Sequence, residues 1–116
     1  MGEEIFGLDI DEPYNAEDVK QAILYWVLDT HQHMIKTKAK LNDMSDQQVE
    51  DYSIDQIEQI VRLQFQRQKY SFDNPTKESL FFVSLSLAGI AKSFENVDKI
   101  SHDLLQILRL IDKLTS

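Results

Sequence analysis

Apolar residues along most of this chain recur at steps of three and four residues, which is the period of an amphipathic α-helix. The pattern covers residues 15–41, a segment that ends near residue 70, residues 74–94 and residues 96–114. The chain has only three glycines and two prolines among 116 residues, too few for a β-fold with many turns. The sequence therefore predicts an all-α protein, an antiparallel up-down-up-down four-helix bundle.

Residues that cap helices indicate where helices begin. Asn15 and Asn96 are suitable N-caps for the first and the last helix. Two capping-box patterns, which begin at Ser45 and Ser53, leave the start of the second helix open. Glutamines such as Gln64 are expected on the wetter side of this helix.

The third helix is apolar on nearly every side. Asn74 followed by Pro75 predicts its start, because proline is favoured at the first helical position. A helix of this kind has to be enclosed by neighbours, so we expect every face to be covered. Gly89 is unfavourable in a helix interior, and we expect a close contact with a neighbouring helix there.

The first and the last helix carry more apolar residues than one core-facing stripe needs. These residues are Leu24, Tyr25 and Leu28 in the first helix and Leu105, Leu108 and Leu110 in the last. Monomers rarely leave large apolar patches exposed, and a two-fold homodimer is the commonest way to cover them. We expect a homodimer; the alternative is that the N-terminal segment covers these residues.

Residues 1–14 are expected to form an extended acidic arm on a single helical domain of residues 15–116. Its large apolar residues, which alternate with acids and a glycine, are Ile5, Phe6, Leu8 and Ile10. Pro13 disfavours helix at the residue before it. Two interpretations are open: the arm docks back on the bundle, or it is a recognition segment that inserts into a partner.

The charge distribution indicates what kind of partner to expect. The net charge is −8, and residues 1–18 contain acids but no lysine or arginine. Nucleic-acid binding needs a basic surface, so no DNA or RNA partner is expected. A basic protein partner suits this charge better.

Several classes of protein need features that this sequence lacks. The longest apolar run, residues 80–91, is shorter than the ~20 residues that span a bilayer, so we expect no membrane-spanning helix. The absence of cysteine excludes disulfide scaffolds and thiol chemistry. The acidic N-terminus does not resemble a secretory signal, and we expect a cytoplasmic protein.

Candidate catalytic and metal-binding residues form no recognisable motif. His31 and His33 point to different sides of a helix, although Asp29 and His33 share a face. Ser84 and Ser86 have no histidine or aspartate at a recognisable catalytic spacing, and no glycine-rich phosphate loop is present. We therefore expect no enzyme activity, metal or cofactor.

The aromatic residues allow two interpretations. Tyr25, Trp26, Phe81 and Phe82 could line an apolar ligand pocket, but aromatics at helical spacing more often belong to the core.

The hypothesis that agrees best with all these features is a non-enzymatic protein–protein interaction module. The alternatives are a ligand- or metal-binding bundle and an acidic inhibitor that blocks a basic partner.

Overall fold

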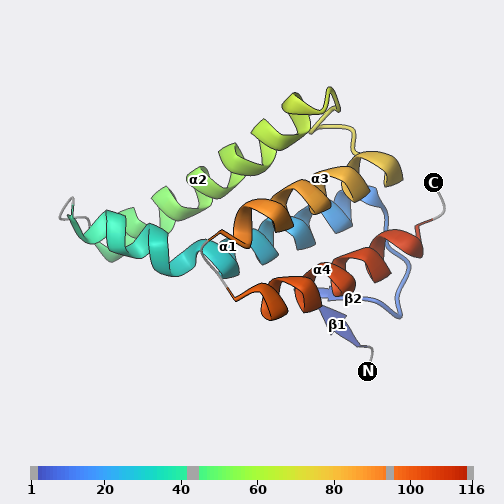
Figure 1. Cartoon of the computed structure of the whole chain (residues 1–116), viewed down its shortest axis with the longest axis horizontal. Coiled ribbons are helices and arrows are strands. Elements are labelled where there is room, and N and C mark those ends of the chain that lie inside the picture. The colour runs from blue at the N-terminus through green and yellow to red at the C-terminus, as the bar shows by residue number, and fades with distance from the viewer. Residues whose placement is uncertain (1–2, 42–44, 94–95, 115–116) are drawn as a thin grey trace.

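The computed structural model describes residues 3–41, 45–93 and 96–114, and it is predominantly helical (Figure 1). Four helices pack against each other, as the sequence predicted. They are α1 (Ala16–Leu41), α2 (Asp46–Arg67), α3 (Lys77–Ala91) and α4 (Val97–Asp112). Two short strands, β1 (Glu4–Ile5) and β2 (Leu8–Asp9), precede them.

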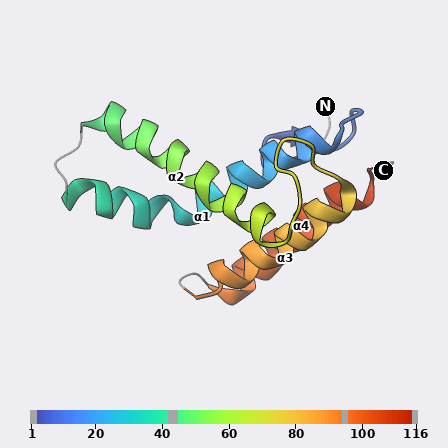
Figure 2. The ribbon, with the colours of Figure 1, turned by 90° about the horizontal axis from the view of Figure 1, so that it is seen from above.

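The helices differ in length, and this decides where the core lies. Helices α1 and α2 have 26 and 22 residues, whereas α3 and α4 have 15 and 16. The far end of the α1–α2 pair therefore projects beyond α3 and α4 (Figure 2). Among the described side chains, the buried apolar residues of α1 lie between Val19 and Val27, and those of α2 between Ile57 and Phe65.

The core contains large side chains from every helix. The largest that are almost fully buried include Trp26 and Ile23 of α1, Phe65 of α2, Leu80 of α3, and Ile100 and Ile107 of α4. Burial of each aliphatic or aromatic side chain of this size contributes about 1.5–3 kcal/mol. The small residues Ser84, Ala88 and Ala91 of α3 are also buried, which lets neighbouring helices approach α3 on that side.

Helix α2 begins at the first of its two predicted starts. Ser45 is the N-cap: its hydroxyl accepts a hydrogen bond from the Gln48 backbone N–H at 3.3 Å, and the Gln48 side-chain oxygen accepts one from the Ser45 N–H at 2.9 Å. This reciprocal pair satisfies two N–H groups that have no partner inside the helix. The helix continues past the second candidate, Ser53, without a break.

Helix α3 begins two residues later than predicted. Thr76, not Asn74, is the N-cap: its hydroxyl accepts from the Ser79 N–H at 3.1 Å, and the Ser79 hydroxyl accepts from the Thr76 N–H at 2.8 Å. The prediction was wrong because Thr76 and Ser79 form two capping bonds, a serine variant of the capping box that the Asn74–Pro75 signal obscured. The helix also ends earlier, at Ala91.

The N-terminal segment is a β-hairpin instead of an extended arm. Glu4 pairs with Asp9 and Ile5 with Leu8, and both turn residues, Phe6 and Gly7, have positive φ (49° and 81°), as in a type I′ turn. Phenylalanine is rare in this conformation, so the sequence did not indicate the turn. The hairpin packs through β1 on α4 and through β2 on α1.

Individual side chains on the helices also differ from the expectations. Gln64 is buried and accepts a hydrogen bond from the Ser86 hydroxyl at 2.8 Å, so it does not belong to the wet side of α2. Leu110 is buried in the core, not on the surface beside Leu105 and Leu108. A side chain at Gly89 would meet nothing within 4 Å, so the expected close contact there is wrong.

The observed cap of α3 can be tested with two alanine substitutions. Thr76→Ala removes the acceptor of the Ser79 N–H and should lower the free energy of unfolding by about 1 kcal/mol. Asn74→Ala, the matched control, should change it by less than about 0.5 kcal/mol. Urea unfolding of the two variants beside the unsubstituted chain measures both values. A larger loss for Asn74→Ala would restore Asn74 as the cap.

Candidate functional site

The outer face of α3 is open to solvent. Phe81, Phe82 and Leu85 are 39%, 43% and 39% exposed, although a helix so apolar was expected to be enclosed. Helix α3 has α1, α2 and α4 as neighbours, and these three cover only part of its circumference. The exposed residues lie on the part that the described residues of these helices leave uncovered.

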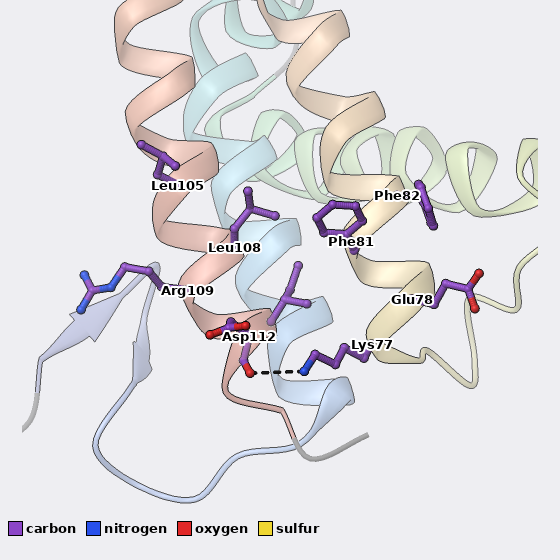
Figure 3. A pocket seen from close by; sticks show the side chains of 9 residues that line it. Lys77, Glu78, Phe81, Phe82, Leu105, Leu108, Arg109 and Asp112 are labelled. Carbon is purple, nitrogen blue, oxygen red and sulfur yellow. Dashed lines mark hydrogen bonds between the residues drawn. The ribbon is translucent and has the colours of Figure 1, made fainter.

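An open groove between α3 and α4, the α3–α4 groove, includes this face. It has a volume of about 700 Å³ and is lined by Lys77, Glu78, Phe81, Phe82, Leu105, Leu108, Arg109, Ile111 and Asp112. Phe81 from α3 and Leu108 from α4 point toward each other across it (Figure 3). Leu105, which is 61% exposed, lies nearer the N-terminal end of α4 than Leu108 does. The structure thus brings the predicted residues Leu105 and Leu108 together with two phenylalanines.

The two cations that line the groove are bound to groups of the chain itself. The Lys77 ammonium donates to the backbone oxygen of Asp112 at 3.3 Å (Figure 3) and to that of Leu114 at 3.2 Å. A cation is favourable there because the C-terminal end of a helix carries a partial negative charge. The Arg109 guanidinium donates to both carboxylate oxygens of Glu3, at 3.2 and 3.3 Å, and so ties the hairpin to α4.

The two carboxylates that line the groove, those of Glu78 and Asp112, form no ion pair with any residue that the structure describes. The Glu78 carboxylate accepts one hydrogen bond, from the Tyr70 hydroxyl at 3.1 Å. Both side chains are exposed. Because Glu3 offsets the charge of Arg109, these two carboxylates are balanced by one ammonium, that of Lys77, and the balance of charge at the groove is negative.

Tyr14 also contributes to the same end of α4. Its hydroxyl donates a hydrogen bond of 2.6 Å to the Leu110 carbonyl, one of the last carbonyls of the helix. Burial raises the pKa of the Tyr14 hydroxyl above its ordinary value of 10.0, and the nearby Asp112 carboxylate raises it further. The phenol therefore stays protonated and keeps its donor role across the neutral range.

A second, smaller groove, the α1–α2 groove, lies between α1 and α2. It has a volume of about 390 Å³ and is lined by Gln21, Leu24, Tyr25, Leu28, Ile54, Ile57, Glu58 and Phe72. It thus holds all three apolar surface residues predicted on the first helix. Tyr25 is 55% exposed, and the Glu58 carboxylate pairs with the Arg62 guanidinium at 2.7 Å.

Phe72, in the connection between α2 and α3, lines the α1–α2 groove and was not predicted as a site residue. The Lys20 ammonium and the Arg62 guanidinium lie 4.1 and 4.2 Å from the centre of its ring, and the Phe65 ring meets it edge-on. Lys20 also donates to the Phe72 carbonyl at 2.9 Å. Its place as one of two aromatics, with Tyr70, in a polar connection was the only signal in the sequence.

The apolar residues predicted in the arm lie apart from the α3–α4 groove. Ile5 and Ile10 are buried in the main core, and Phe6 and Leu8 are partly buried against it. The Phe6 ring lies 6.4 Å from the Tyr25 ring and 6.3 Å from the Trp26 ring. In this structure the hairpin docks on the bundle, which is the first of the two interpretations of the arm.

Among the suspected chemical groups, those that the structure describes do not gather at either groove. The side chains of His31 and His33 lie outside the described residues, and the Asp29 carboxylate is 3.9 Å from the Lys99 ammonium. The part of the chain that is described contains no cluster of three metal-binding side chains. Ser84 is buried, and Ser86 donates to Gln64.

Comparisons with known proteins identify no relative. No family model matches the chain, and no curated protein and no solved structure matches it either. Across the described ranges, none of the helices has both the length and the apolar character needed to cross a bilayer. We therefore infer the function from the two grooves and their charges.

The role of Tyr14 can be tested by Tyr14→Phe, which removes only the hydroxyl. Loss of the hydrogen bond to Leu110 should lower the free energy of unfolding by about 1 kcal/mol near neutral pH. Because the folded state raises the pKa, this contribution is complete below pH 10.0 and is lost as the pH rises through the folded value. Urea unfolding of both proteins at neutral and at alkaline pH measures this. Equal stability at neutral pH would contradict the role.

Proposed function

We propose that this protein is a non-enzymatic interaction module, such as an adaptor, a small regulator or an assembly subunit, that binds other proteins through apolar helix faces. The observation that carries the proposal is the α3–α4 groove, where Phe81, Phe82 and Leu105 are exposed together. Contiguous apolar surface of this kind is typical of binding sites, and aromatic side chains are common binding hot spots.

The proposal includes a role for the whole chain. Its four helices act as an up-down-up-down bundle that holds the grooves rigid, and residues 1–14 act as an acidic arm beside them. The tie between Glu3 and Arg109 supports this, because it places the hairpin next to the α3–α4 groove. The module acts in the cytoplasm.

Self-association is the second part of the proposal, and the α1–α2 groove suits it better than the α3–α4 groove does. A two-fold interface brings the same patch of both copies together. Through the α3–α4 groove it would therefore place the carboxylates of one copy in the same interface as the equivalent carboxylates of the other. In the α1–α2 groove the carboxylate of Glu58 is already paired with Arg62, while Tyr25 and Ile54 are exposed. A homodimer through this groove would cover the surplus apolar residues of α1.

Site-specific photo-crosslinking in the cells that make the protein tests the proposal. A photoreactive phenylalanine analogue is placed at Tyr25 or at Leu105, with the exposed Lys92 as the matched control position. We expect covalent adducts from at least one groove position and none from Lys92, because a bound partner covers the grooves. Mass spectrometry of each adduct distinguishes a second copy from another protein.

Light scattering after size exclusion, over a tenfold range of concentration, complements this experiment. A dimer mass that Tyr25→Asp abolishes and Leu105→Asp leaves unchanged would support self-association through the α1–α2 groove. A monomer at every concentration, with no adduct from either groove position, would contradict the proposed function.

A further inference from the structure

Accepting the function proposed above, we propose that the α3–α4 groove binds an amphipathic helix of a partner protein whose polar face is basic. The groove has three properties that bear on its occupant: its shape, its charge and its relation to a second copy.

The shape of the groove suits a helix. Two helices that lie side by side leave a furrow between them into which a third helix packs its side chains. The floor is apolar, with Phe81 on one side and Leu108 and Ile111 on the other. From Leu105 to Asp112 the groove follows α4 for seven residue steps, about 10 Å. A partner helix fills that length with apolar residues at positions i, i+3 or i+4, and i+7.

The charge of the groove selects a basic partner. The Arg109 guanidinium is paired with the Glu3 carboxylate, whereas the Lys77 ammonium donates to the neutral carbonyls of Asp112 and Leu114 and keeps its charge. The carboxylates of Glu78 and Asp112 form no ion pair among the described residues, so two carboxylates outweigh one ammonium at the groove. The net charge of −8 adds to this local negative charge and steers a basic partner toward the groove.

Asp112 strengthens this argument because its position is unfavourable for the fold. It is the last residue of α4, where the partial negative charge of the helix end disfavours a carboxylate. Residues that break a local rule without a visible gain in the folded chain are candidates for a role in binding. A lysine or arginine of a bound partner would supply the missing counter-charge.

A second copy of the chain is a poorer occupant of this groove. A two-fold contact would bring Glu78 and Asp112 of one copy to the same interface as their equivalents in the other. Both copies also carry a net charge of −8. The N-terminal hairpin does not fill the groove either: it lies beside it through the Glu3–Arg109 pair, but no residue of the hairpin lines it.

Binding of designed helical peptides to the full chain tests the proposal. The first peptide carries leucines at i, i+3, i+4 and i+7 and lysines and arginines at the polar positions. The second has glutamates in place of the basic residues, and the third has the composition of the first with its leucines moved off the stripe. Fluorescence anisotropy measures the affinity of each labelled peptide. We expect the first to bind at least tenfold more tightly than either of the others.

Substitutions in the chain locate the binding site. Leu105→Ala should weaken binding of the first peptide by about tenfold, because it removes an apolar wall of the groove. Asp112→Asn and Glu78→Gln should each weaken it by roughly two- to fivefold, and this loss should shrink at high salt. Leu63→Ala is the matched control: Leu63 is 44% exposed on α2 and lines neither groove, so this substitution should have no effect. Circular dichroism confirms that each variant is folded.

Four outcomes would overturn the proposal. Binding of the third peptide as tight as the first would show that charge alone attracts them, and binding of the second as tight as the first would show that charge plays no part. Equal binding by the Leu105→Ala and Leu63→Ala variants would place the site elsewhere. A dimer that Leu105→Asp dissociates would show that a second copy occupies the groove. The proposed function would survive each of these results if crosslinks still form at Tyr25 or Leu105, so the two failures are distinguishable.

Discussion

The structure depends on one mismatch: α3 is apolar around most of its circumference, but the described elements of the chain cover only part of it. Ser84 and Ala88 face inward and are buried, whereas Phe81, Phe82 and Leu85 remain exposed. The helix is stable in this position because its inner side completes the core around Trp26. Its outer side is left as apolar surface that burial against another molecule would stabilise.

The end of α4 shows how the rest of the chain is arranged around this surface. Its last carbonyls accept hydrogen bonds from Tyr14, which precedes α1, and from Lys77 at the start of α3. Arg109 holds the hairpin through Glu3. These contacts join the N-terminal segment, α3 and α4 at one end of the groove. Because Glu3 offsets Arg109 and Asp112 forms no ion pair among the described residues, these contacts couple the electrostatics of the groove to the packing of the fold.

Much of the fold follows from local patterns in the sequence. The helical periods predict four packed helices, and the cap at Ser45 is visible as a motif, because these features depend on residues within one helical turn. The hairpin was missed because Phe6 adopts a conformation that phenylalanine rarely takes. The sequence also indicated that Leu105 and Leu108 were surplus to the core, but not that Phe81 would face them, since which side of α3 is covered depends on how the other helices pack around it.

The central claim is that the outer face of α3 is open within a single copy of the chain. Hydroxyl-radical footprinting of the purified protein at high dilution measures this directly, by comparing oxidation of Phe81 and Phe82 with that of the buried Phe65. The account predicts that Phe81 and Phe82 are oxidised several times faster than Phe65, because their rings reach solvent. Protection of all three phenylalanines to the same degree at every dilution would mean that the chain itself covers this face, and it would contradict the account.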